Sequence, residues 1–202
     1  MSRRLRTTGL FCLLATLWGF SFLAIEVGLD SLEPVLFAAF RYDIAAVLLL
    51  GVAVLRGGEW RPTGRGDRLA IAGGGVFLVA GNGLLFVGQQ TVPSGVAALM
   101  QGLVPVVTAL WALLLLPEEG LSTVGGVGIL CGFLGVGLIV RPDPGNLLGA
   151  DVVGRGLVLA QVASVALGGV LVQRADPSLG SAALSGWSML VGGVLLHLVS
   201  PA

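Results

Sequence analysis

Polar side chains recur at a helical spacing inside one apolar stretch of the chain, residues 92–116. Ser94, Gln101 and Thr108 lie seven residues apart, so in a helix they would fall along one stripe. Pro105 lies in the same stretch, and because proline lacks an N–H, the carbonyl of Gln101 would lose its helical partner and the helix would kink. The pattern favours a polar face that lines a cavity. Hydrogen bonds to neighbouring helices, as packing contacts, explain the same residues equally well.

Other neutral polar or aromatic residues stand in separate apolar stretches. Trp18 and Ser21 would share one face of a helix, as would Gln161 and Ser164. Asn82 lies between two glycines, whose missing side chains would let a backbone or a ligand come close. Together these residues offer neutral hydrogen bonding and aromatic surface, which suits an uncharged or zwitterionic solute better than a strongly anionic one. Each of them taken singly is also compatible with a structural role.

Three ionisable residues interrupt the apolar stretches: Glu26, Arg41 and Asp43. A charge in the middle of a membrane costs ~2.5–3.5 kcal/mol on insertion scales, so each must find a partner, reach water or be neutral. Glu26 and Arg41 would lie near enough for their side chains to meet across antiparallel helices, so we expect a structural ion pair. Asp43 would then be a lone deep carboxylate and a candidate for proton coupling. A neutral acid, hydrogen-bonded within the helix bundle, is the alternative.

The composition indicates which elements must position these residues. The chain of 202 residues is 55% hydrophobic and 11% charged, which is typical of a membrane protein. A helix needs ~20 apolar residues to cross ~30 Å of hydrocarbon. The sequence therefore predicts an all-α integral membrane protein with seven transmembrane helices. The expected helices cover residues 9–29, 34–55, 69–88, 92–116, 121–140, 156–172 and 179–199.

Charge and motif content argue against several classes of function. The formal net charge is zero, and no long basic run points to nucleic-acid binding. The two cysteines fall inside apolar stretches and His197 is the single histidine, so we expect no metal site and no cofactor. The sequence has no GxxxxGK[ST], HExxH or GxSxG motif, so we expect neither ATP coupling within the chain nor enzymatic activity.

All the basic residues are arginines, and their distribution predicts the orientation in the membrane. Three arginines precede the first apolar stretch, four lie between residues 56 and 68, and one follows residue 172. Only Arg141 and Arg155 border the membrane on the opposite side. The positive-inside rule therefore places the N-terminus in the cytoplasm. Seven crossings then leave the C-terminus outside.

Residues 141–155 divide five apolar stretches from the two that follow. An offset of 147 residues superposes residues 156–196 on residues 9–49, so one offset spans two apolar stretches and the loop between them. Because an odd number of helices separates the two copies, the second would enter the membrane from the opposite side. This is an inverted-topology repeat, as found in many secondary transporters. Chance similarity between apolar helices is the alternative.

Four sequence segments together resemble a known family. They are TLWGFSF at residues 16–22, LFAAFRYDIAAVLLL at 36–50, SGVAALMQGLVPVVTALWALLLLPEE at 94–119 and GFLGVGLIVRPD at 132–143. The combination is similar to the EamA-type branch of the drug/metabolite transporter superfamily. The resemblance implies two inverted five-helix halves around a central cavity for small organic solutes. Residues 1–140 would be a first complete repeat, 141–155 the inter-repeat loop, and 156–202 the first two helices of a C-terminally truncated second repeat.

The resemblance implies secondary transport by alternating access, with export favoured, in the bacterial cytoplasmic membrane. The expected solute is a small organic metabolite, an amino-acid-like solute or a drug. The expected partners are the lipid bilayer and this solute, without nucleic acid. The alternative is a truncated, non-transporting membrane protein or a helical partner that requires another chain. A homodimer or further C-terminal helices could supply the missing cavity walls.

Overall fold

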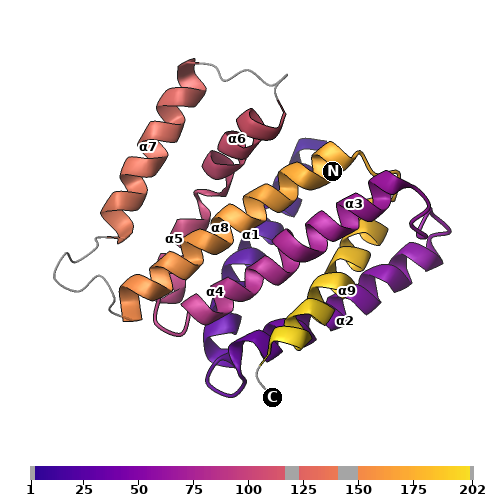
Figure 1. Ribbon diagram of the computed structural model, residues 1–202, viewed down its shortest axis with the longest axis horizontal. Helices are drawn as coiled ribbons and strands as arrows, with labels where there is room; N and C mark the ends of the chain where they lie inside the picture. Colours follow the sequence, from indigo (N-terminus) through magenta and orange to yellow (C-terminus); the bar gives the residue numbers. More distant parts are fainter. Residues whose placement is uncertain (1–2, 117–122, 141–149, 201–202) are drawn as a thin grey trace.

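The computed structural model describes residues 3–116, 123–140 and 150–200 of the chain, and these are helical apart from short connections (Figure 1). Within the described residues, a π-helix (η1) and a 3-10 helix (η2) interrupt one of the apolar segments. The elements are α1 (Arg3–Gly28), α2 (Pro34–Leu55), α3 (Arg65–Gly73), η1 (Gly74–Val79), η2 (Ala80–Asn82), α4 (Gly83–Gly88), α5 (Ser94–Gln101), α6 (Val104–Leu115), α7 (Thr123–Val140), α8 (Ala150–Ala175) and α9 (Ser181–Val199).

The lengths and composition of the helical segments are those of a membrane protein. Six segments of the described chain are long and apolar enough to cross a membrane, and a shorter apolar helix begins at Thr123. These six segments and α7 correspond to the seven helices expected from the sequence. The prediction of an all-α membrane protein with about seven helices is therefore confirmed.

Three helices begin earlier than the sequence predicted, because polar and charged residues extend them beyond the apolar run. The first helix, expected from residue 9, begins at Arg3. The helix expected from residue 156 begins at Ala150, and Asp151 and Arg155 form an ion pair of 2.9 Å one turn apart on its surface. The helix expected from residue 69 begins at Arg65. Charged first turns of this kind suit the polar edge of a membrane. The remainder of the predicted inter-repeat loop, residues 141–149, lies outside the described residues.

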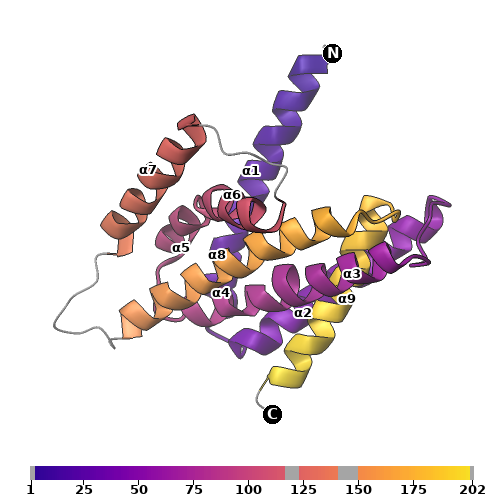
Figure 2. The same cartoon turned by 45° about the horizontal axis from the view of Figure 1, so that its top comes forward.

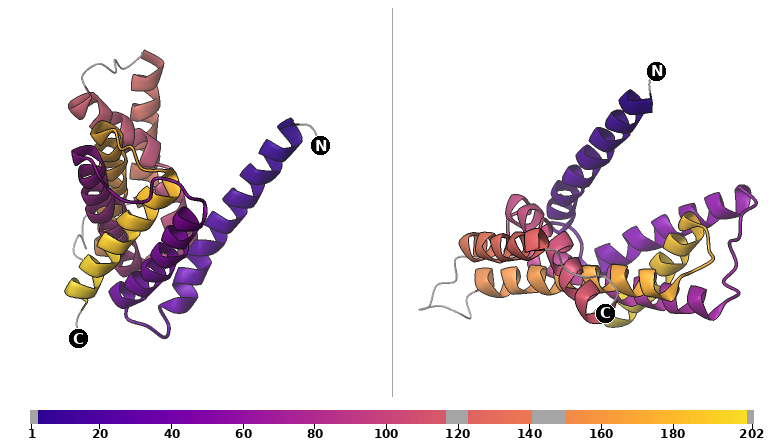
Figure 3. Two further views of the ribbon diagram at one scale, coloured as in Figure 1. Left: turned by 90° about the vertical axis from the view of Figure 1, so that its right-hand side faces the viewer. Right: turned by 90° about the horizontal axis from the view of Figure 1, so that it is seen from above.

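The contacts between helices define their order in space (Figure 1). The succession α3, η1 and α4 packs between α9 and α8, α2 packs along the other side of α9, and α6 packs on α8. α7 is beside α6. α1 leans away from the others, so that its N-terminal end stands clear (Figures 2 and 3). The middle segment α3–η1–α4 is thus the most enclosed part of the described chain.

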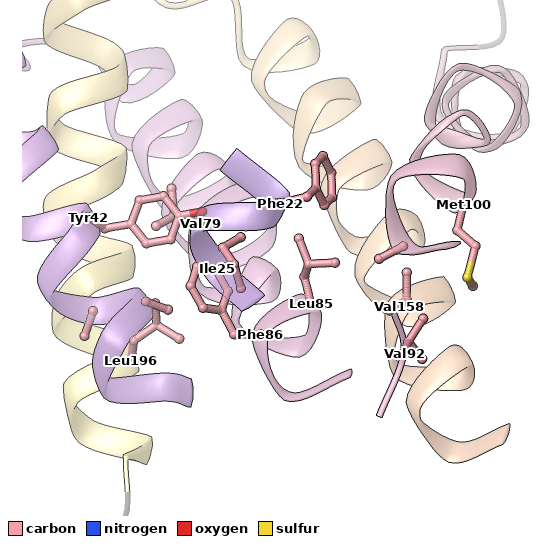
Figure 4. Close-up of a cluster of buried hydrophobic side chains, with 13 residues drawn as sticks. Phe22, Ile25, Tyr42, Val79, Leu85, Phe86, Val92, Met100, Val158 and Leu196 are labelled. Atoms are coloured by element: carbon pink, nitrogen blue, oxygen red, sulfur yellow. The ribbon is translucent and has the colours of Figure 1, made fainter. Parts of the chain in front are cut away.

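The main apolar core takes residues from α1, α2, α4, α5, α8 and α9 (Figure 4). Phe22 and Ile25 come from the last part of α1 and contribute to the same cluster as Leu85 and Phe86 of α4. The Phe86 ring is fully buried, and the ring of Phe37 meets it edge to face, with the ring centroids 5.6 Å apart. This core holds α1 at its C-terminal end, while the rest of the helix is exposed.

A buried carboxylate joins the α2–α3 connection to the α8–α9 connection. The Asp67 side chain accepts hydrogen bonds from the backbone N–H groups of Thr63, Gly64, Ser178 and Leu179, and from the Ser178 hydroxyl, at 2.8–3.3 Å. Because backbone N–H groups before a helix otherwise lack partners, one carboxylate stabilises two connections at the same time. Both connections are thereby held at one end of the helix bundle.

Glycines allow η1 and its neighbours to approach α8 and α9. A Cβ atom on Gly75 would lie 2.7 Å from Cγ1 of Val191 on α9. A Cβ on Gly168 of α8 would lie 2.8 Å from the backbone nitrogen of Leu78. Neither separation is possible for a real side chain. Glycine therefore lets the Val191 side chain reach the η1 backbone, and it lets the backbones of α8 and η1 approach each other at Gly168 and Leu78.

Gly168→Ala should destabilise the fold, because its methyl group would push against the backbone at Leu78. We expect a loss of about 1–3 kcal/mol in the free energy of unfolding. Gly169→Ala is the matched control, since nothing lies within 4 Å of the position of its Cβ and alanine favours the helix by ~0.5–1 kcal/mol. Thermal unfolding in detergent micelles compares the two variants. Equal unfolding temperatures would contradict this account of the α8–η1 contact.

Glu33 caps the start of α2. Its side chain accepts from the Leu36 N–H at 2.7 Å and from the Ser200 hydroxyl at 3.0 Å, while Pro34 occupies the first turn as expected. Desolvation is the largest single cause acting on the pKa of Glu33 and raises it. The hydrogen bonds from Leu36, Val35 and Ser200 together outweigh it and lower the pKa below its usual value of ~4.3.

The cap should make stability depend on pH. Because the pKa is lowered in the folded state, the ionised cap stabilises the fold above about pH 4.3, and this contribution is lost as the pH falls through the folded-state pKa. Glu33→Gln should therefore cost about 0.5 kcal/mol at pH 7 and nothing at acidic pH. Thermal unfolding at several pH values measures the difference from the wild-type chain. Asp30→Asn, in the preceding turn, should show no such trend; a similar trend there would refute the assignment to Glu33.

Candidate functional site

A small cavity of about 130 Å³ lies among α1, α2, η1, η2, α4, α5 and α8. Its lining residues are Trp18, Ser21, Phe22, Ile25, Arg41, Leu78, Asn82, Leu85, Gln101, Gln161 and Val165. Five of the residues that the sequence suggested for a solute cavity are among them: Trp18, Ser21, Asn82, Gln101 and Gln161. These five side chains come from α1, η2, α5 and α8, which are distant in the sequence.

A larger cavity elsewhere has fewer polar groups in its wall. It measures about 450 Å³, lies between α3, η1 and α8, and is lined by apolar residues and glycine except for Arg174. The Arg174 guanidinium already donates to the Leu115 carbonyl at 2.9 Å. Binding sites combine apolar walls with several convergent polar groups, so we take the smaller cavity as the candidate site.

Three amide side chains and one hydroxyl form a continuous chain of hydrogen bonds at the cavity. Gln101 donates to the Gln161 carbonyl, Gln161 donates to Asn82 Oδ1 at 2.8 Å, and Asn82 donates to the Tyr42 hydroxyl. Gln161 is only 2% exposed, and a buried amide requires such partners. The chain links α5, α8, η2 and α2. Among the described residues, nothing donates to the side-chain oxygen Oε1 of Gln101, so this atom is available as a hydrogen-bond acceptor.

Two interrupted helices meet at this hydrogen-bonded chain. The wide turns of η1 change to the tight turns of η2, which ends at Asn82. α5 ends at Gln101, and α6 begins at Val104 with Pro105 in its first turn. The predicted kink at Pro105 is therefore confirmed. π-helical turns and breaks within membrane segments commonly accompany functional sites, because irregular backbone is tolerated where it lines a cavity.

The same break separates the polar stripe expected on residues 92–116. Thr108 donates to the Val104 carbonyl at 2.7 Å within α6, and Ser94 lies in the first turn of α5. Neither side chain lines the cavity, and Pro105 does not line it either. The seven-residue spacing assumed one continuous helix, whereas the break after Gln101 redirects everything that follows. Of this stripe, only Gln101 reaches the candidate site.

Ser164 lies one turn after Gln161 on α8, but its side chain bonds to the backbone of η1 and not to the chain of amides. Its hydroxyl donates to the Phe77 carbonyl of η1 at 2.9 Å, and it packs against Gly81. It therefore satisfies a backbone group of the π-helix and does not line the cavity. On α1, the Ser21 hydroxyl similarly donates to the Trp18 carbonyl at 2.6 Å, while both residues contribute to the cavity wall.

The expected ion pair between Glu26 and Arg41 does not form among the described residues. There the ion pairs are Arg155 with Asp151 and His197 with Asp43. The Arg41 guanidinium instead lies 5.8 Å from the centre of the Phe86 ring and contributes to the cavity wall. The prediction relied on the depth of the two residues in the membrane alone. Whether two side chains meet also depends on the rotation of each helix about its axis.

Asp43 was expected to be a lone carboxylate, but it has a partner. Its Oδ2 lies 2.7 Å from Nε2 of His197 on α9, and each side chain is 35% exposed. Sequence reasoning missed this partner and also missed Tyr42, the only tyrosine of the chain. A tyrosine between two ionisable residues in an apolar stretch was the available signal. In the described part of the chain, no group of three or more His, Cys, Asp or Glu residues is placed to hold a metal.

Polar cavities between interrupted helices recur in membrane transporters. Comparison with known families agrees with this class. The profile of the EamA-like transporter family matches residues 6–141. The chain therefore belongs to this family.

Curated relatives carry transporter names. The chain is 33% identical over 187 residues to the "Uncharacterized inner membrane transporter YedA" of Escherichia coli K12, covering 91% of this chain and 58% of the relative. It is 28% identical over 190 residues to an "Uncharacterized transporter" of Archaeoglobus fulgidus, covering 94% of this chain and 65% of the relative. The chain thus spans roughly three fifths of the length of these relatives. No solved structure matches it significantly.

Gln161→Leu should destabilise the fold, because it removes the central member of the hydrogen-bonded chain. The partly buried side chains of Asn82 and Gln101 would each lose a partner, at about 1–3 kcal/mol per unsatisfied group. Gln90→Leu is the control, since Gln90 is exposed in the turn after α4. Thermal unfolding in detergent micelles measures both variants. A Gln161→Leu chain as stable as the control would show that the hydrogen-bonded chain does not stabilise the fold.

Proposed function

We propose that this protein carries a small uncharged or zwitterionic organic solute across the bacterial cytoplasmic membrane. The observation that supports this most directly is the cavity in which the chain of amides meets two interrupted helices. Membership of a transporter family and relatives named as inner membrane transporters support the same function. A secondary transporter needs a binding site near the middle of the membrane that can be reached from either side.

The chemistry of the wall favours this class of solute. Asn82, Gln101 and Gln161 offer neutral donors and acceptors, and the indole of Trp18 offers an aromatic face. Arg41 adds one positive charge, which could pair with the carboxylate of a zwitterion such as an amino-acid-like metabolite. Among the described residues that line it, no carboxylate is present to pair with a cation. The cavity therefore suits a small metabolite or drug with several hydrogen-bonding groups.

The proposed mechanism is alternating access, with α1 as the movable wall. α1 supplies Trp18, Ser21, Phe22 and Ile25 to the cavity, yet it is exposed along most of its length. The cavity is small, so a larger solute would require α1 to move outward. In this proposal residues 1–140 and 156–202 are two inverted units. In this proposal the N-terminus and the Asp67 carboxylate with its hydrogen-bonding partners lie on the cytoplasmic side, as the arginine distribution predicts.

A second candidate is a chain that transports only together with additional helices, or that serves as a helical partner without transporting. The observation that favours it is the incomplete enclosure of the site, since the Trp18 side chain is 62% exposed although it belongs to the cavity wall. A homodimer or another chain could cover this side. An assay of transport by the chain alone separates the two candidates.

Expression in bacterial cells tests the proposal. We expect cells with the wild-type chain to differ from empty-vector cells in the amount of a small set of uncharged or zwitterionic metabolites in the medium, measured by untargeted mass spectrometry. Gln101→Leu removes the acceptor at the end of the amide chain, so it should lower this difference by ~10-fold, the effect of about 1.4 kcal/mol. Gln90→Leu should retain it.

Membrane amounts of all variants are matched by immunoblot. If no metabolite differs between wild-type and empty-vector cells, the helical-partner candidate replaces transport by this chain. If metabolites differ but Gln101→Leu behaves as wild type, the protein transports and the cavity is not its binding site.

A further inference from the structure

The Asp43 and His197 side chains meet across the contact between α2 and α9. The two helices run in opposite directions, because Gly193 lies against Asp43 and Gly186 lies against Leu50. Side chains lean toward the N-terminus of their own helix, so Asp43 and His197 lean toward each other. A Cβ on Gly193 would lie 2.5 Å from Asp43 Oδ1, so only glycine gives the carboxylate this room.

The pair lies in surroundings with few other charges. The Phe40 ring meets the imidazole edge to face, with centroids 5.3 Å apart. The elements packed against the pair add no ionisable side chain from η1, η2, α4 or the rest of α9. α2 and its cap add Glu33, Arg41 and Tyr42, and the first turn of α3 adds Arg65, Asp67 and Arg68. α1 adds Glu26 near its C-terminal end and Arg3, Arg4, Arg6 and Cys12 in its N-terminal half.

We propose that Asp43 and His197 form a proton-binding pair, linked to the solute cavity by residues 41–43 of α2. An ionised carboxylate only accepts hydrogen bonds, so in the neutral-imidazole state Nε2 carries the hydrogen and donates to Asp43. An added proton then binds Nδ1, and the pair becomes an imidazolium and a carboxylate. The Nδ1–H bond breaks again when the proton returns to water. Histidine is the side chain best suited to such exchange between about pH 5 and 8.

Three successive residues of α2 connect the pair to the cavity. Arg41 lines the cavity, Tyr42 accepts from Asn82 of the amide chain, and Asp43 contacts His197. Because the three side chains leave one turn of helix in different directions, a shift of α2 toward or away from His197 also moves the Tyr42 hydroxyl. The state of the proton therefore changes the geometry of the amide chain. As a coupling site this inference rests on the proposed transport function, but its test does not require a solute.

The chain contains a single histidine and two asparagines, Asn82 and Asn146, which allows a selective measurement. The full chain is labelled with ¹⁵N-histidine, ¹⁵N-asparagine and ¹⁵N-tryptophan and studied by NMR in lipid nanodiscs. Asn146→Ser identifies the side-chain amide signal of Asn82. We expect the His197 imidazole signals to change from the neutral to the protonated pattern between about pH 9 and pH 5, and the Asn82 amide to shift with the same midpoint.

Variants separate a linked proton site from a structural contact. In His197→Gln and in Asp43→Asn, the pH-dependent shift of the Asn82 amide should be lost, while the indole signals show a retained fold. In Tyr42→Phe, the imidazole should still titrate and the Asn82 response should be lost. Asp30→Asn, which removes a carboxylate before α2, should leave both responses unchanged.

Two outcomes would overturn the proposal. One is an imidazole signal that stays constant across this pH range. The other is an Asn82 shift that persists in His197→Gln. Either result leaves the metabolite assay in cells as the separate test of transport. Conversely, a negative metabolite assay leaves the proton-binding pair to be judged by these spectra alone.

Discussion

The hydrogen-bonded chain from Tyr42 through Asn82 and Gln161 to Gln101 is the interaction on which the rest of the arrangement depends. Within a membrane there is no water to satisfy a buried amide, so each partner must come from another helix. Apolar contacts between helices tolerate a small slide or rotation. A chain of amides does not, because every donor must face its acceptor. It therefore fixes how α2, η2, α8 and α5 are turned relative to one another.

The interrupted segment α3–η1–α4 explains how these amides can meet. The π-helical turns of η1 and the tighter turns of η2 change the direction in which Asn82 points, compared with an unbroken helix. Carbonyls released by such turns need partners, and the Ser164 hydroxyl supplies one at Phe77. Glycines bring α8 and α9 against this segment closely enough to enclose it. Backbone irregularity, close packing and the polar site therefore occur at the same place for connected physical reasons.

The number and order of helices could be predicted from the sequence, because the length of an apolar run is set by the thickness of the membrane. Helix ends were less predictable, since charged turns such as Asp151–Arg155 continue a helix beyond its apolar part. Asn82, Gln101 and Gln161 could be selected as cavity residues, because amides in apolar helices need a special environment.

Pairing across helices could not be predicted in the same way. Glu26 and Arg41 have suitable depths, yet their helices are not turned to bring them together. Asp43 and His197 are 154 positions apart in the sequence, and their contact follows from the antiparallel packing of α2 on α9. The depth of a residue in the membrane follows from its position along an apolar run of the sequence. The rotation of a helix about its own axis depends on all its contacts with neighbouring helices.

The single turn of α2 at residues 41–43 explains how the candidate cavity and the Asp43–His197 pair can influence each other without touching. Tyr42 belongs to the amide chain and Asp43 to the contact with α9, so the two sites share one rigid piece of backbone. If binding at the first site favours one position of this turn, the same position is favoured at the second site. The coupling free energy is the same in both directions. The reciprocity needs no relay of moving side chains. It requires only that α2 has two positions and that each site distinguishes between them.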